Sequence, residues 1–178
     1  MMNSNANRLL AGALATLLLV VVAFPQSSTN KGQGPVTPSR PFSIFRAQSL
    51  ADLESRLKSE NKTEDLIAGE GLQMRIAVQH SKGEPAPGGE AHDKADDIYY
   101  VVDGSATLTI GGKLEEPKEI SAGEWRGPRI IGGQTVEAKK GDLIMVPRGT
   151  PHQRSTTGQD YTIILIKVFA DPVGPTKP

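Results

Sequence analysis

From residue 66 onward the sequence consists of short apolar segments separated by turns, and this pattern limits the fold more than any other feature. Apolar residues recur at every second position in 74–79, which is the period of a strand with one buried face. Further strand candidates lie at 98–102, 106–110, 143–146 and 163–169. Together with 19 glycines and 13 prolines in 178 residues, these strands predict an antiparallel sandwich or barrel.

Charge and cysteine content exclude several classes of protein. The chain has 20 basic and 20 acidic residues, so it lacks the basic excess typical of nucleic-acid binders. It has no cysteine, which excludes disulfides, thiolate metal sites, a cysteine nucleophile and lipid attachment to an N-terminal cysteine. A histidine-based site must draw on His80, His92 and His152.

Residues 1–24 predict a signal peptide. Leu9 to Phe24 is an uncharged apolar run, shorter than the about 20 residues that a membrane-spanning helix needs. Small residues at its end favour cleavage near Ala23, and an uncleaved membrane anchor is the alternative. Either way we expect the rest of the chain to be exported, to the periplasm or the medium, with no stable membrane insertion once the signal is cleaved.

The remaining chain divides by composition. Residues 25–41 are rich in Pro, Gly and Ser and predict a flexible linker. Residues 42–66 form a helical lead-in, with a short helix over about 49–60 that packs on the barrel exterior through one leucine face. A β-barrel domain is expected over 67–170 and a Pro-rich tail over 171–178. Within the barrel, Asp103 and Gly104 predict a hairpin turn, and 113–133 is expected to be a long connection.

Two clusters of residues carry chemistry. Glu90 and His92 are two positions apart, so on a strand both side chains point to the same face, and Asp97 follows. In the second cluster, a strand ends in a tight turn that presents His152. Two histidines and a carboxylate from separate strands could bind divalent Fe, Mn, Ni or Zn and leave coordination positions open.

These clusters resemble the two motifs of the cupin superfamily. The first motif has His, His, Glu and Gly at positions that Glu90, His92, Asp97 and Gly104 occupy here. The second motif is followed through Gly141, Pro147, Gly149 and His152, with Thr156 in place of the closing Asn. The motifs and their flanking strands cover about residues 71–169.

The resemblance implies an all-β fold, a cupin-type antiparallel β-barrel (double-stranded β-helix or jelly roll) with one short N-terminal helix. It also implies one divalent metal ion bound by Glu90, His92, Asp97 and His152, and a homodimer. Glu90 stands where the family has its first His, and Asp97 is one methylene shorter than the usual Glu. More oxygen among the ligands weakens the preference for soft or borderline ions.

Other side chains near the motifs have two interpretations each. Tyr99 lies on the same strand face as Asp97 and is the catalytic candidate as a hydrogen-bond donor, or it packs against the barrel wall. His80 could point inward as a further ligand or be structural. Arg148 and Arg154 flank His152 and could bind an anionic substrate. Trp125 caps the barrel mouth or fills a gap beneath the connection.

Two functions follow from this sequence. The first is an exported, metal-dependent enzyme acting on a small molecule, of the dioxygenase, isomerase or decarboxylase type. The alternative is a non-catalytic barrel that binds a small ligand or a metal. Apart from Tyr99 and His80 the sequence offers no obvious general base, so both functions stay open.

Overall fold

The computed structural model of this chain describes residues 40–83 and 85–174. The predicted signal peptide (1–24), most of the predicted linker and the last residues of the tail lie outside the described residues. Among the described helices there is none with both the length and the apolar character to cross a membrane.

Strands dominate the described part of the chain. The one described helix is α1 (Ala47–Leu57). The strands are β1 (Lys62–Ile67), β2 (Met74–Lys82), β3 (Gly89–His92), β4 (Ala95–Ile110), β5 (Lys113–Leu114), β6 (Lys118–Ser121), β7 (Glu124–Gly127), β8 (Ile130–Ile131), β9 (Gln134–Lys139), β10 (Leu143–Val146), β11 (His152–Ser155) and β12 (Asp160–Phe169).

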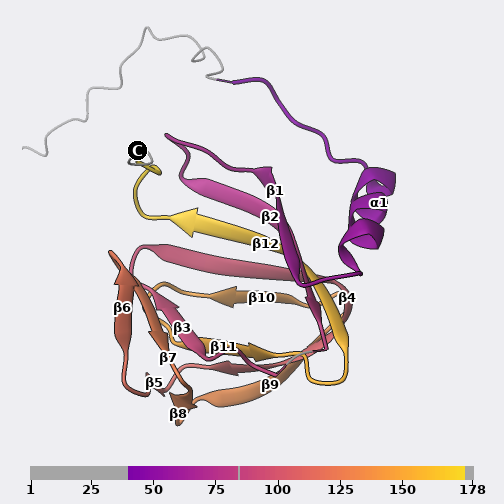
Figure 1. Cartoon of the computed structure of the whole chain (residues 1–178). Helices are drawn as coiled ribbons and strands as arrows, with labels where there is room; N and C mark the ends of the chain where they lie inside the picture. Colours follow the sequence, from indigo (N-terminus) through magenta and orange to yellow (C-terminus); the bar gives the residue numbers. More distant parts are fainter. Residues whose placement is uncertain (1–39, 84, 175–178) are drawn as a thin grey trace, which may run out of the picture. The chain divides into compact units, whose positions relative to one another are not determined.

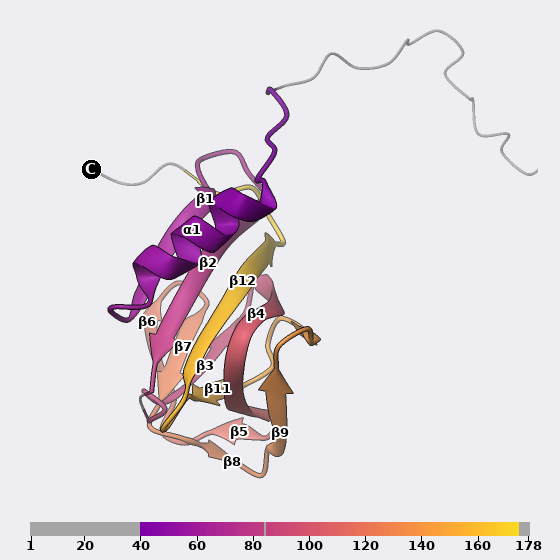
Figure 2. The same cartoon turned by 90° about the vertical axis from the view of Figure 1, so that its right-hand side faces the viewer.

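The long strand β4 belongs to two sheets at once (Figures 1 and 2). Its first half pairs with β12 and β10, and its second half pairs with β9 and β11. The main order is β1-β2-β12-β4-β11-β3-β7-β6, every pairing is antiparallel, and β5 and β8 form a separate small sheet. The predicted all-β antiparallel barrel with one short helix is confirmed.

The core lies on the inner face of the barrel. Alternation along β4 turns Asp97, Tyr99 and Val101 inward, while Ile98 and Tyr100 are more exposed. The buried cluster is mostly aliphatic, as a sequence with only 4% aromatic residues requires, and comprises Tyr99, Val101, Ala106, Leu108, Ala138, Val146, Tyr161, Ile163 and Leu165. Asp97 of the first motif therefore shares a strand face with this core.

Helix α1 covers the outer face of β2 (Figure 2). Leu53 and Leu57 are buried against Val78, as the leucine pattern predicts. The helix occupies Ala47–Leu57 where the sequence predicts about 49–60. Strand β1 falls inside the predicted helical lead-in and pairs with β2. The sequence did not predict β1, because its segment KTEDLI is mostly polar.

Two local predictions are wrong. Asp103 and Gly104 do not form a hairpin turn, because β4 continues through them. Gly104 has φ +76°, and with the nearby irregularity in the β4–β12 register it bends the strand without reversing it. The connection at 113–133 contains β5 to β8, which are only two to four residues long and too short to show periodicity.

At the bend, Gly104 is expected to tolerate an added side chain less well than Gly158, another glycine with positive φ. A Cβ there would overlap the carbonyl oxygen of Asp160, whereas Gly158 has the same φ of +76° and open space where a Cβ would lie. Gly104→Ala should therefore lower the free energy of unfolding by about 2 kcal/mol or more beyond Gly158→Ala, as overpacking adds to the backbone penalty that both share. Urea unfolding of the two variants measures the difference, and equal losses would contradict the steric argument.

Candidate metal centre

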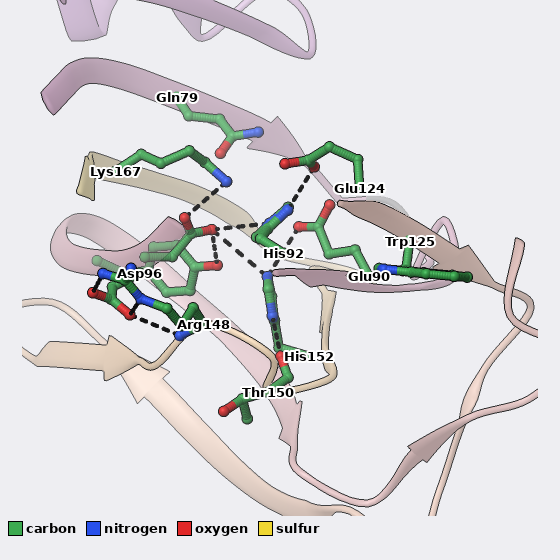
Figure 3. Close-up of polar contacts among 12 residues, drawn as sticks. Gln79, Glu90, His92, Asp96, Glu124, Trp125, Arg148, Thr150, His152 and Lys167 are labelled. Atoms are coloured by element: carbon green, nitrogen blue, oxygen red, sulfur yellow. Dashed lines mark hydrogen bonds and ion pairs between the residues drawn. The ribbon is translucent and has the colours of Figure 1, made fainter. Parts of the chain in front are cut away.

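Three strands bring the four predicted ligands to one point inside the barrel (Figure 3). Glu90 and His92 come from β3, Asp97 from β4 and His152 from β11, and one ligand atom of each lies within 4.8 Å of the others. Asp97 Oδ2 lies 3.4 Å from His92 Nε2 and 3.6 Å from His152 Nε2, and Glu90 Oε1 lies 3.2 Å from His152 Nε2. His92, Asp97 and His152 are buried and Glu90 is half-buried.

Each histidine ring is oriented from its far side. Nδ1 of His92 donates to Glu124 Oε2 at 2.6 Å, and Nδ1 of His152 donates to the carbonyl oxygen of Thr150 at 3.0 Å. Both acceptors lack a proton to give, so the Nδ1 atoms carry the protons. In the neutral rings the Nε2 lone pairs are then directed at the cluster, the arrangement found in histidines that bind metals.

Asp97 is a buried carboxylate held by several partners. Lys167 Nζ lies 2.9 Å from Oδ1, and the Tyr99 hydroxyl donates to Oδ2 at 3.1 Å. Burial acts to raise the pKa of Asp97, but the close contact with His92 and the charge of Lys167 outweigh it and hold the pKa well below the usual range. Asp97 is therefore ionised at neutral pH, as a metal ligand must be.

Glu90 and His92 also have pKa values displaced from their ordinary ranges. Burial acts to raise the pKa of Glu90, but the close contact with His152 and the charges of His152 and Arg126 lower the pKa to about 2. Arg126 lies 2.9 Å from Glu90 Oε2. Burial acts to lower the pKa of His92, and the close contact with the Asp97 carboxylate reverses this, so that the pKa is raised overall.

The donor set fits one divalent ion. The Nε2 atoms of His92 and His152 are buried and have no hydrogen-bond partner, although both face carboxylate oxygens. A buried polar atom without a partner costs free energy, and a cation bound between these atoms and the carboxylates removes that cost. Two imidazole nitrogens with two carboxylates suit Mn, Fe, Ni or Zn.

A cavity of about 280 Å³ adjoins the cluster. Gln79, Tyr99, Leu108 and Ile110 contribute to its wall, and Glu90, Arg126, His152 and Arg154 place charged or ligand groups on it. Tyr99 therefore contributes to the cavity wall, the first of its two interpretations, and donates to Asp97. Burial raises its pKa well above 10, so the hydroxyl stays protonated and acts as a hydrogen-bond donor.

Solved structures with a similar fold are known. A protein from Bacillus halodurans is similar over 79% of this chain and 88% of its own, with 18% identity and a TM-score of 0.51. A conserved Klebsiella pneumoniae protein with a double-stranded β-helix domain (15% identity, 62% and 78% of the two chains, TM-score 0.45) and a cupin superfamily protein from Desulfitobacterium hafniense (14%, 62% and 80%, 0.41) are also similar. Protein-family models and curated protein sequences gave no match.

The two motifs lie on strands that pair around the cluster, with His152 opposite Glu90. This chain has the cupin fold. In this cupin barrel His80 lies outside the cluster, on the face of β2 that also carries Val78, and its Nδ1 is 2.9 Å from Thr162 Oγ1. The suggestion that His80 is a further ligand is therefore wrong for this structure.

The remaining candidates separate clearly. Arg148 forms two hydrogen bonds from its guanidinium to Asp96 and does not line the cavity, whereas Arg154 does. Trp125 donates to Asp93 Oδ2 at 2.9 Å and is not part of the cavity wall.

Sequence reasoning missed Glu124 and Lys167. Lys167 carries a readable signal, since it is the one charge within the apolar run 163–169 and an inward-facing lysine there needs an acidic partner. Glu124 has no such signal, because it lies in a short polar strand whose position opposite His92 depends on the β3–β7 pairing.

The low pKa of Glu90 predicts a pH-dependent stability of the metal-free cupin. A carboxyl group whose pKa is lower in the folded state than in the unfolded state contributes stability above its unfolded pKa, and this contribution is lost as the pH falls toward the folded pKa. For Glu90 the interval runs from about 4.5 down to about 2. Glu90→Gln should therefore show a shallower loss of unfolding free energy across this interval than the wild type. Chemical denaturation at a series of pH values measures it, with the exposed Glu137→Gln on β9 as control. Parallel curves for wild type and Glu90→Gln would contradict the assignment.

Proposed function

We propose that this protein is an exported cupin that binds one divalent metal ion through Glu90, His92, Asp97 and His152 and acts on a small molecule in the adjoining cavity. The observation that carries the proposal is the pair of buried Nε2 atoms, on His92 and His152, that face two ionised carboxylates without a hydrogen-bond partner. His80 also has a buried Nε2 without a hydrogen-bond partner, but only the Nε2 atoms of His92 and His152 lie, in the described residues, within 4.8 Å of two carboxylates and of each other.

A bound divalent ion would supply a Lewis acid that polarises an oxygen of the small molecule. The chain's own groups prepare the site for it. Glu124 and the Thr150 carbonyl fix the two imidazole rings, and Lys167 and Arg126 hold the carboxylates of Asp97 and Glu90 in place. The Tyr99 hydroxyl, kept protonated by burial, donates its proton to Asp97 Oδ2, so its oxygen is left to accept a hydrogen bond from the small molecule at the cavity wall. Dioxygenase, isomerase and decarboxylase chemistry are the three proposed classes.

The second candidate function is a barrel that binds a small ligand or a metal without turnover. One observation favours it: in the described residues, each acidic side chain that faces the cluster is already engaged. Glu90 contacts Arg126 and His152, Asp97 contacts Lys167, and Glu124 contacts His92. None of the three is a free general base, so single-turnover assays with candidate substrates separate an enzyme from a binding protein.

Export and homodimer formation are part of the proposal. Export depends on residues 1–24, and N-terminal sequencing of the protein recovered from the periplasm and the medium tests the cleavage near Ala23. The homodimer is proposed from the family resemblance, and the molar mass in solution tests it.

Metal content is the direct test of the site. We expect the purified protein to carry about one equivalent of Fe, Mn, Ni or Zn, and the His92→Ala, His152→Ala double variant to carry none, because the nitrogen donors are gone. Elemental mass spectrometry on protein purified without a histidine tag measures both.

Two adjacent carboxylates give a matched control for this measurement. Asp97→Asn removes a proposed ligand charge and should lower the metal content. Asp96→Asn removes a charge that pairs with Arg148 away from the cluster and should not change it. A wild type that stays empty after incubation with each ion, with circular dichroism showing a folded barrel, would reject the metal site.

The hydrogen bond from His92 to Glu124 should set part of the metal affinity. Glu124→Ala removes the acceptor that orients the ring, and we expect the dissociation constant for Zn²⁺ to rise about 10- to 100-fold. Glu124→Gln retains a hydrogen-bond acceptor but not the charge, so its dissociation constant should lie between those of the wild type and Glu124→Ala. Glu119→Gln, in the neighbouring strand β6, serves as the control. Competition titration with a chelating dye measures the constants, and an unchanged affinity in Glu124→Ala would contradict the role given to Glu124.

A further inference from the structure

Within the described residues, Arg154 lacks an acidic partner, unlike the other arginines that line the surface depression at the metal cluster, Arg75 and Arg126. Arg75 pairs with Asp65 at 2.7 Å, and Arg126 pairs with Glu90 at 2.9 Å. For Arg154, no carboxylate lies within ion-pair distance in the described part of the chain. It is half-buried and borders the cavity of about 280 Å³. A half-buried guanidinium without a counter-ion is costly, and a ligand anion would remove that cost.

The side chain of Arg154 is held in place by neutral groups. It lies two residues after His152 on β11, so both side chains face the barrel interior. Its guanidinium donates to Gln79 Oε1 and to Ser81 Oγ, each at 3.3 Å, and it lies 5.8 Å from the centre of the Tyr161 ring. Figure 3 shows Gln79 beside the cluster. The two hydrogen bonds use two of the five donors of an arginine, so the head group is oriented while most of its donors stay available.

The balance of charges around the cluster also favours an anionic ligand. The three carboxylates of Glu90, Asp97 and Glu124 are balanced by the three cations of Arg126, Arg154 and Lys167, and the fourth cation there, Arg75, is balanced by Asp65. A divalent ion therefore adds two positive charges that the protein does not neutralise. An anionic ligand restores the balance, and in a partly buried cavity this electrostatic gain is larger than in water.

We propose that Arg154 binds the carboxylate group of the small molecule that enters the cavity, so that the ligand class is small organic carboxylates. This inference rests on the proposed function, in which the cavity binds a small molecule. A carboxylate matches the planar fork of one guanidinium. A phosphate carries more charge and takes more donors, and in the described residues Lys167, Arg126 and Arg75 are already paired.

The test is a titration of the purified protein with benzoate, acetate, their neutral amides and inorganic phosphate. It is run on the zinc-loaded and the metal-free protein, and the Nε–Hε nuclear magnetic resonance signal of Arg154 reports the binding. Arg154→Gln identifies that signal by its absence, and isothermal titration calorimetry gives the affinities of the variants. Arg148→Gln is the matched control, since it also flanks His152 but pairs with Asp96. Circular dichroism checks that each variant is folded.

We expect benzoate to shift the Arg154 signal, and its dissociation constant to rise at least about tenfold in Arg154→Gln and to stay unchanged in Arg148→Gln. Arg154→Lys, which retains the charge but loses the fork, should bind with intermediate affinity, as a purely structural role would not predict. Equal binding of benzoate by wild type and Arg154→Gln, equal binding of benzamide and benzoate, or an Arg154-dependent preference for phosphate would each overturn the inference.

Metal content measured on the same samples separates the two proposals. Stoichiometric zinc without Arg154-dependent carboxylate binding rejects the inference and leaves the metal site intact. Arg154-dependent binding in a protein that takes up no metal supports the inference and rejects the metal site.

Discussion

The buried carboxylate of Asp97 is the constraint on which the arrangement of the barrel interior depends. A charge in this position is stable only if partners surround it, and they come from four strands: His92 from β3, Tyr99 from β4 itself, His152 from β11 and Lys167 from β12. Lys167 is the register partner of Asp97 across the β4–β12 pair, so the sheet hydrogen bonds and the ion pair fix the same alignment. A slip of one residue in that pairing would turn Lys167 outward and leave the carboxylate without its cation.

Strand β4 connects this electrostatic arrangement to the architecture. Its first half carries Asp97 and Tyr99 in one sheet, and its second half pairs with β11, which carries His152 and Arg154. The bend at Gly104 lets one strand serve both sheets, and the two halves of the chain's polar site meet as a result. The cavity is lined from both halves of β4, by Tyr99 and by Leu108 and Ile110, so its wall combines ligands, a tyrosine and an arginine with aliphatic side chains.

Much of the fold and of the candidate site could be predicted from the sequence, because the spacing of residues along a strand determines which side chains share a face. The i,i+2 spacing of Glu90 and His92 and the turn before His152 indicated a shared site, the resemblance to the cupin motifs gave its four residues, and the leucine pattern predicted α1. The predictions that were wrong depended on contacts between residues far apart in the sequence. Asp103 and Gly104 look locally like a turn, and only the contact with Asp160 shows that the strand continues. His80 and Arg148 have the right chemistry, but the β2 face toward α1 and the ion pair with Asp96 take them away from the site.

The position of Lys167 in the last strand has a consequence for the order of folding. His92 and Asp97 lie near the middle of the chain, yet the cation that balances Asp97 joins them only when β12 docks between β2 and β4. Contacts between residues so far apart in the sequence form slowly, because the intervening loop must close first. A nascent chain that lacks β12 therefore exposes an acidic, half-built cluster, and the closing of the final strand is the event that converts it into a neutral one.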